Sequence, residues 1–256
     1  MENQTIQGLW VGPSLSTMER VSISSFLANG HDYHLYVYDD VAGTPPGTTL
    51  KDASEILPPS QIFLYREHKS YAGFANFFRY KLLLERGGWW MDTDVICLQP
   101  VVLNSPYAFA TERDTDGRSF VTSGIIKAPQ DSELMERAWN ICKSKRPEDL
   151  KWGETGPSLM HNLVLRSGLC EYIQDHDVFC PIDSARWFDA VLPGRRLSFG
   201  VQSLTVHLWN EFWRRMKLDK DESYPPSSLY EQLKQRYLRP DPNGSSDSLR
   251  EELHSA

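Results

Sequence analysis

Apolar and polar positions repeat with two different periods over the first ninety residues, which indicates strands separated by helices. The apolar run at residues 6–11 predicts a buried strand, and residues 14–29 have the spacing of an amphipathic helix. Ser16 and Glu19 fit a capping box at the start of that helix. A second strand is predicted at residues 33–38. Strand, helix and strand at this spacing form a βαβ unit, as found in sheets with parallel strands.

The pattern continues through the rest of the chain. A loop that carries Pro45 follows the second strand, residues 71–86 predict a long helix, and residues 89–98 predict a strand that acidic residues interrupt. Further strands are predicted at residues 107–111, 120–128 and 204–209, and further helices at residues 132–144 and 157–166. With no internal repeat or linker, residues 1–239 are expected to form one domain, followed by a polar tail at residues 240–256.

Composition narrows the class of protein. Of 256 residues, 40% are hydrophobic and 12% aromatic, so a sizeable core is expected and disordered, collagen-like and low-complexity chains are excluded. With 27 Lys and Arg against 34 Asp and Glu, the net charge is −7. The chain lacks the overall excess of positive charge that typically binds nucleic acid, so no such partner is expected. Neither a signal peptide nor an apolar stretch of about 18 residues is present, which predicts a cytoplasmic protein.

The four cysteines indicate no scaffold of their own. They are Cys97, Cys142, Cys170 and Cys180, and none forms a Cys-x-x-Cys pair. Wide spacing of this kind signals neither a zinc site nor a disulfide framework. We therefore expect reduced and mostly buried thiols.

Two aspartates, Asp92 and Asp94, interrupt the apolar segment GGWWMDTDVICL. Residues i and i+2 of a regular strand share a face, so both carboxylates would point at one divalent cation such as Mn²⁺ or Mg²⁺, which favours oxygen ligands. Burying two like charges side by side without such a partner is costly. The alternative is a solvated turn between two short strands.

The preceding helix brings further polar groups toward these aspartates. The helix advances roughly 10 Å over residues 79–86, and the strand over residues 88–92 returns roughly 13 Å. Arg79 and Asp92 are therefore expected at the same end, with Asn76 one turn before Arg79 on the same helical face. A guanidinium, an amide and carboxylates together suit a ligand with phosphates and hydroxyls. A purely structural ion pair of Arg79 is the alternative.

The segment FANFFRYKLLLERGGWWMDTD resembles the DXD sugar-transferase signature of glycosyltransferase family 32. That family also covers α-1,4-galactosyltransferases and yeast mannosyltransferases and, more distantly, the clostridial glucosylating toxins. Four more blocks lie before and after this segment in the order that the family has, so the resemblance covers most of residues 5–215. They are IQGLWVG, SFLANGHDYHLYVYD, WGETGPSL and VHLWNEFWR. It implies an α/β fold of the GT-A type, Rossmann-like, with a mixed central sheet flanked by helices and the nucleotide sugar at the carboxyl ends of the strands.

The resemblance also implies roles for individual residues. Trp10 and Val11 would line the nucleobase pocket, although core packing is the alternative for Trp10. Arg79 would contact the phosphates or the sugar of the donor. Asp94 would bind Mn²⁺ or Mg²⁺ directly, and Asp92 would contact the sugar or ribose with a water-mediated link to the metal.

Other blocks supply further expected site residues. His207 would be an additional metal ligand, Asn210 would reach the diphosphate, and Ser123 and Gly124 would lie near the sugar. Thr155 would cap the helix that begins at residue 157. Many relatives have Asp at the position of Asn76, a difference that leaves the identity of the sugar open.

The implied reaction is metal-dependent transfer of a hexose from a nucleotide sugar, with a UDP-sugar as expected donor, to a saccharide or glycolipid hydroxyl, with retention of configuration. A degenerate domain that only binds nucleotide or sugar is one alternative, and Asn76 favours it. A haloacid-dehalogenase-like phosphatase is another. A basic group indicates either peripheral membrane contact or a solvated surface, and comprises Arg195, Arg196, Arg214, Arg215 and Lys217. Nothing in the sequence indicates an oligomeric state.

Overall fold

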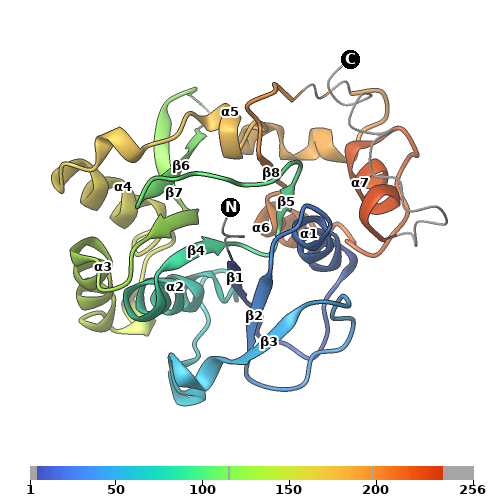
Figure 1. Cartoon of the computed structure of the whole chain (residues 1–256). Coiled ribbons are helices and arrows are strands. Elements are labelled where there is room, and N and C mark those ends of the chain that lie inside the picture. The colour runs from blue at the N-terminus through green and yellow to red at the C-terminus, as the bar shows by residue number, and fades with distance from the viewer. Residues whose placement is uncertain (1–4, 115, 196, 198, 239–256) are drawn as a thin grey trace.

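A six-stranded mixed sheet with strand order β3-β2-β1-β4-β7-β6 forms the centre of the molecule, and helices pack against both faces (Figure 1). The computed structural model describes residues 5–114, 116–195, 197 and 199–238. The parallel strands are β1 (Ile6–Leu9), β2 (Tyr33–Val37), β3 (Thr49–Asp52) and β4 (Gly88–Met91), and the antiparallel strands are β6 (Ala108–Arg113) and β7 (Ser119–Ala128). A second small sheet pairs β5 (Val95–Cys97) with β8 (Thr205–His207).

The expected βαβ unit is present. Its helix and the helix that precedes β4 cover opposite faces of the sheet. Helix α1 (Thr17–Ala28) joins β1 to β2, and α2 (Ala72–Arg86) precedes β4. The capping box is formed, with the Ser16 amide donating to the Glu19 carboxylate at 2.8 Å. Because successive strand residues alternate between faces, Trp89 packs in the core beneath α1 and Trp90 in the core beneath α2.

The remaining helices extend these two cores and form a third. Helix α3 (Glu133–Lys143) packs on α2, and α4 (Pro157–Arg166) packs on β7. Helix α7 (Leu229–Leu238) packs on α1, and a third core lies between these two helices and the small sheet. The other two helices are α5 (His176–Phe179) and α6 (Asn210–Met216). Within the described part of the chain, no helix combines the length and the apolar character needed to cross a bilayer.

Several predictions from the sequence need correction. The strand expected at residues 89–98 is two strands, β4 and β5, which belong to different sheets. Strand β3 was expected to be loop, because its largely exposed residues give no apolar pattern. All four cysteines are free thiols, and three are buried, as predicted, whereas Cys170 is exposed. The polar tail expected at residues 240–256 lies outside the described residues.

Gly87 joins α2 to β4 in a conformation that only glycine adopts readily, with φ of 64° and ψ of −164°. A Cβ atom there would lie 2.4 Å from the backbone nitrogen of Gln130. We expect Gly87→Ala to lower the free energy of unfolding by about 1–3 kcal/mol through backbone strain, and by more through the overlap with Gln130. Urea denaturation would measure the change.

Gly30 provides a matched control for this substitution. It also has a positive φ, of 81°, but no atom lies within 4 Å of the position its Cβ would take. Gly30→Ala therefore introduces backbone strain without overlap. A loss of stability in Gly87→Ala no larger than that in Gly30→Ala would contradict the role assigned to the close contact.

Candidate active site

The Asp-Thr-Asp segment forms a turn between β4 and β5. The amide of Val95 donates to the carbonyl of Asp92 at 3.1 Å, and the amide of Asp92 donates to the carbonyl of Gly124 on β7 at 2.8 Å. The expectation of a regular strand with Asp92 and Asp94 on one face is therefore wrong. The alternative is correct in placing a turn here, but Asp94 is only 8% exposed, so the turn is not fully solvated. The chain must turn because β4 and β5 join different sheets.

Arg79 and Asp92 meet, as the opposed directions of helix and strand predicted. The Arg79 Nη2 atom donates to Asp92 Oδ1 at 2.9 Å, and the Trp90 indole donates to the same oxygen at 2.8 Å. Arg79 Nη1 donates to the carbonyl of Ser123, and the guanidinium lies 5.0 Å from the centre of the Trp90 ring. The alternative of an ion pair is thus also realised, and the partner is Asp92 itself. Burial raises the pKa of Asp92, and Arg79 opposes that shift.

Strand β7 leaves room for this carboxylate. A Cβ atom at Gly124 would lie 3.0 Å from Asp92 Oδ2, so a side chain there would crowd the aspartate. Ser123 donates its hydroxyl to the Asn76 side-chain oxygen at 3.4 Å. The structure therefore gathers Asn76, Ser123 and Gly124 around Arg79 and Asp92. The sequence had placed Ser123 and Gly124 there only by resemblance.

The side chain of Asn76 uses both of its polar atoms. Its nitrogen donates to the Thr155 hydroxyl at 3.5 Å, while its oxygen accepts from Ser123. An ionised aspartate could not donate to Thr155. The prediction that Thr155 caps α4 is wrong, since Gly156 is the N-cap residue and no side chain caps the helix. The Thr155 hydroxyl instead faces Asn76.

Asp94 and His207 form the second part of the site. Asp94 Oδ2 lies 3.1 Å from His207 Nε2 and accepts a hydrogen bond from the backbone amide of Asn210 at 2.8 Å. Burial alone would raise the pKa of Asp94, but His207 and the amide of Asn210 hold it below its ordinary value. Burial would likewise lower the pKa of His207, and Asp94 instead holds it well above its usual range. The two side chains therefore form a buried ion pair.

This pair also suits a divalent cation. Two neighbouring ligands of an octahedral Mg²⁺ with bonds of about 2.1 Å lie about 3.0 Å apart, close to the 3.1 Å between the Asp94 oxygen and the His207 nitrogen. Carboxylate and imidazole are suitable ligands for Mn²⁺ as well. Asp92 is held by Arg79 and Trp90, which fits a water-mediated rather than a direct contact with such an ion.

An unusual backbone conformation directs Asn210 toward Asp94. Trp209 has a φ of 60°, a left-handed conformation that is strained for an aromatic residue, and it joins β8 to α6. Its indole donates to the carbonyl of Ile182 at 3.0 Å, and its ring centre lies 4.1 Å from that of His207. These contacts hold the turn that begins α6 with the Asn210 amide against Asp94.

Two cavities meet at these side chains. The larger has a volume of about 770 Å³, and Trp10, Val11 and Asn210 line it. The smaller, of about 280 Å³, is lined by Asn76, Ser123, Gly124 and His207 among others. Both are lined by Ala72, Arg79, Asp92, Asp94 and Glu211. A ligand that spans the two cavities would pass directly over the two aspartates.

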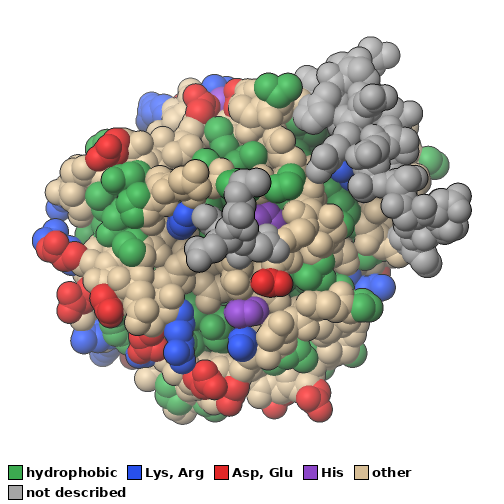
Figure 2. Space-filling view, viewed as in Figure 1, with side chains coloured by type: hydrophobic (Ala, Val, Ile, Leu, Met, Phe, Trp, Pro, Cys, Tyr) green, Lys and Arg blue, Asp and Glu red, His purple; other side chains and the backbone are tan. Residues whose placement is uncertain are grey.

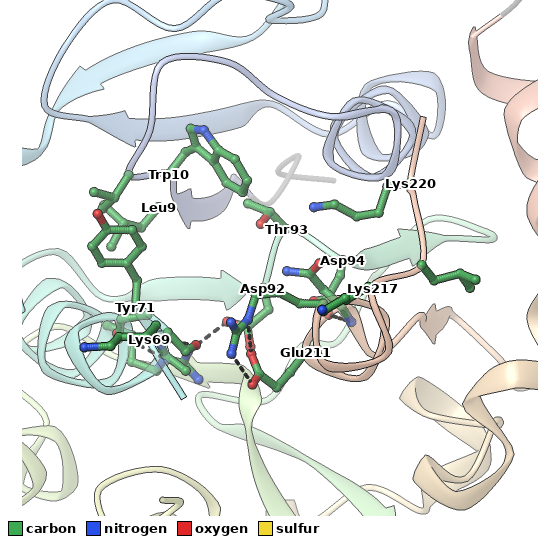
Figure 3. A pocket seen from close by; sticks show the side chains of 18 of the residues that line it. Leu9, Trp10, Lys69, Tyr71, Asp92, Thr93, Asp94, Glu211, Lys217 and Lys220 are labelled. Atoms are coloured by element: carbon green, nitrogen blue, oxygen red, sulfur yellow. Dashed lines mark hydrogen bonds and ion pairs between the residues drawn. The ribbon is translucent and has the colours of Figure 1, made fainter. Parts of the chain in front are cut away.

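The larger cavity combines an aromatic ring with basic side chains. Trp10 and Lys220 lie toward one side of it, and Asp92 and Glu211 toward the other (Figure 3). The Lys220 ammonium is 5.7 Å from the centre of the Trp10 ring, and the buried indole nitrogen has no hydrogen-bond partner among the described residues. Trp10 therefore lines the cavity and is not merely packed in the core. An aromatic surface beside lysines suits a nucleoside diphosphate.

Sequence reasoning missed four side chains of the site. Lys217, Lys220 and Glu211 line the larger cavity from α6 and the loop after it, and Glu112 lines the smaller one from β6. Lys217 and Lys220 follow shortly after the block VHLWNEFWR in the sequence. Their closeness to that block was the only signal that could have assigned them to the site. Glu112 directly follows the apolar strand predicted at residues 107–111, a weaker signal than the one that singled out Asp92 and Asp94.

The basic side chains that the sequence indicated for membrane contact do not form one continuous patch. Arg214 and Arg215 both bind Glu211, with a distance of 2.7 Å to its Oε1 atom in each case, and Arg195 lies 3.5 Å from Asp189. Lys217 lines the larger cavity, and Arg196 lies outside the described residues. Acidic and basic side chains are interspersed on the face shown in Figure 2.

A separate cluster of possible metal ligands lies on the surface, at Asp175, His176 and Asp177. Both ring nitrogens of His176 are engaged by carboxylates, Nδ1 at 2.6 Å from Asp175 and Nε2 at 2.9 Å from Asp177. Asp175 is exposed and Asp177 is half-buried, and neither lines the cavities that meet at Asp94. This cluster is therefore separate from the candidate site.

Comparison with known proteins finds a family match for part of this arrangement. The family model described as the glycosyltransferase sugar-binding region containing the DXD motif matches residues 18–111, which include α2 and the Asp-Thr-Asp turn. No curated protein matches significantly. The solved PaToxG glycosyltransferase has 15% identity and a TM-score of 0.49 over 64% of this chain and 69% of its own. A transferase solved as a double cysteine-to-serine mutant has 11% identity and a TM-score of 0.45, over 68% and 91%.

The match covers part of the site. It includes the helix that carries Arg79 and the turn that carries Asp92 and Asp94, and the six-stranded mixed sheet with helices on both faces has the expected GT-A, Rossmann-like architecture. Sequence region and fold therefore favour glycosyl transfer over the phosphatase alternative. Residues 18–111 therefore carry the glycosyltransferase sugar-binding region that contains the DXD motif, a match that supports a glycosyltransferase.

Proposed function

We propose that this glycosyltransferase moves a hexose from a nucleoside diphosphate sugar, with UDP as the expected nucleotide, to a hydroxyl of a saccharide or glycolipid acceptor, and that the reaction requires Mn²⁺ or Mg²⁺. One observation carries the proposal. The Asp94 and His207 ligand atoms lie 3.1 Å apart, beside Arg79, where a nucleotide-sized cavity meets a smaller one. The nucleotide would occupy the larger cavity and the hexose would extend into the smaller.

Negative charge develops on the diphosphate as its bond to the sugar breaks. A divalent ion held by Asp94 and His207 would supply electrostatic stabilisation of that charge. Arg79 is oriented for the same task, because three of the five N–H groups of its guanidinium are held by Ala75, Ser123 and Asp92, which leaves two free to bind phosphate oxygens. Lys217 and Lys220 add positive charge along the larger cavity.

Retention of the anomeric configuration is part of the proposal and rests on the resemblance to family 32. In such a reaction the acceptor hydroxyl attacks the face from which the diphosphate departs, and the phosphate itself takes the proton. Arg79, by binding the phosphate, would hold it close to the attacking hydroxyl. The acceptor would approach through the smaller cavity, which Ser123 and Gly124 line.

The direct test is nucleotide release from a panel of UDP- and GDP-hexoses, with Mn²⁺, with Mg²⁺ and with EDTA. We expect release from one donor, loss of that release in EDTA, and recovery when Mn²⁺ is added in excess. Equal release in EDTA would contradict the role of the metal. Absence of both release and metal-dependent nucleotide binding would contradict the proposed function as a whole.

Asn76 favours a second candidate, a domain that binds a nucleotide sugar without transferring the hexose. Its amide is engaged by Thr155 and Ser123 and has no charge with which to bind sugar hydroxyls strongly. Metal-dependent UDP binding by calorimetry, together with no nucleotide release from any donor and acceptor tested, would select this candidate. The charged set of Arg79, Asp94 and His207 favours catalysis.

A further inference from the structure

We propose that Glu112 binds a hydroxyl group of the sugar in the smaller cavity and thereby orients that sugar for transfer. The inference rests on the proposed function and assigns a role to a side chain outside the Asp-Thr-Asp turn. Its class of ligand is a neutral polyhydroxylated ring. The experiment below distinguishes the donor hexose from an acceptor saccharide as the source of that ring.

The position of Glu112 is the first observation. It is the last residue but one of β6, only 7% exposed, and it lines the smaller cavity. Glu112 pairs with Phe120 of β7, so Thr122, two residues further along, is on the same face of the sheet. Both Glu112 and Thr122 line the smaller cavity. Strand pairing therefore holds the carboxylate at the wall of the cavity.

The unused binding capacity of this carboxylate is the second observation. An ionised carboxylate has about four lone-pair sites for hydrogen bonds, and among the described residues Thr122 accounts for at most one of them. Among the described residues no Lys, Arg or His forms an ion pair with Glu112. Burial, with Asp92 and Asp94 nearby, raises its pKa to about 7, although His207 and Thr122 oppose the shift. A buried polar group of this kind calls for hydrogen-bond donors from a ligand.

The remaining walls of the smaller cavity favour a sugar as that ligand. Four aromatic side chains line it, those of Tyr65, Trp152, Trp209 and Phe212. Aromatic faces pack against the apolar C–H faces of a sugar ring, while a carboxylate accepts from its hydroxyls. The cavity is also little more than a third of the volume of the one beside it. A sugar ring, with apolar faces and hydroxyls at its edge, therefore matches both the aromatic side chains and the carboxylate of the smaller cavity.

The experiment compares wild type with Glu112→Ala, Glu112→Gln and the surface control Glu133→Gln. With Mn²⁺ present, calorimetry gives the affinities for UDP and for the UDP-hexose that the wild type turns over. Nucleotide release without acceptor gives hydrolysis, and release with a saccharide acceptor gives transfer. We expect UDP affinity to stay within about twofold in every variant, because Glu112 does not line the nucleotide cavity.

The loss of one hydrogen bond to a charged group should change the sugar-dependent quantities by roughly 10- to 100-fold in Glu112→Ala, and by less in Glu112→Gln. If Glu112 binds the donor hexose, the affinity for the UDP-hexose and the rate of hydrolysis both fall. If it binds the acceptor, kcat/KM for the acceptor falls while hydrolysis is unchanged. Either result supports the proposal, since a purely structural defect would lower UDP affinity too.

Two results would overturn the proposal. One is unchanged hexose affinity, hydrolysis and transfer in Glu112→Ala. The other is a fall in UDP affinity by the same factor as the sugar-dependent quantities, which would assign Glu112 to the stability of the fold. A wild type that binds no UDP in the presence of Mn²⁺ would contradict the proposed function first, and with it the role of Glu112.

Discussion

Asp94→Ala is expected to reduce nucleotide release from the donor sugar by roughly 100- to 1,000-fold, the effect of removing one preorganised electrostatic contact from a transition state. The substitution removes the carboxylate that His207 and the amide of Asn210 contact, and with it one of the two ligands proposed for the divalent ion. Asp94→Asn should lose nearly as much activity, because it has no negative charge. Steady-state release at saturating Mn²⁺ measures both variants.

A matched surface substitution separates this effect from general damage. Asp116 is exposed and far along the chain from the turn, so Asp116→Asn should release nucleotide at the wild-type rate. Circular dichroism and urea denaturation would establish that Asp94→Asn is folded, since the amide keeps a hydrogen-bond acceptor for Asn210. Full activity in purified Asp94→Ala would remove the assignment of Asp94 as a metal ligand.

Arg79→Ala is expected to reduce both activity and stability. Transfer should fall about 100-fold, because a charge-assisted contact to the leaving diphosphate is lost. Removing one partner of a buried ion pair typically costs about 3–5 kcal/mol. The loss of stability should be smaller here because the Asp92 side chain is 29% exposed and the Trp90 indole still donates to it. Nucleotide release and urea denaturation give the two quantities.

A second substitution distinguishes the two effects of Arg79. In Arg79→Ala combined with Asp92→Asn, no uncompensated carboxylate is left in the site, so part of the lost stability should return while activity stays low. Arg79→Lys keeps a positive charge but cannot hold Ala75, Ser123 and Asp92 together in the geometry of a guanidinium. Recovery of activity in the double variant would show that Arg79 only balances the charge of Asp92.

The sequence alone determined the parts of the fold and site that depend on local pattern. The first βαβ unit, the capping box at Ser16 and helix α2 follow from periodicity and from side chains within a few residues of one another. The meeting of Arg79 with Asp92 was also predictable, because a helix and a strand joined by Gly87 and Gly88 run in opposite directions over nearly equal lengths. Only thirteen positions separate those two residues.

Only the tertiary structure decided how the carboxylates of the site are arranged. Asp94 meets His207 across 113 positions, and the turn that carries Asp94 exists because β4 and β5 belong to different sheets. Glu112 and Lys220 reach the two cavities through strand pairing and loop packing that leave no periodic trace in the sequence. Periodicity records which side of an element is buried, whereas the partners of a buried polar group depend on contacts between segments far apart in the chain.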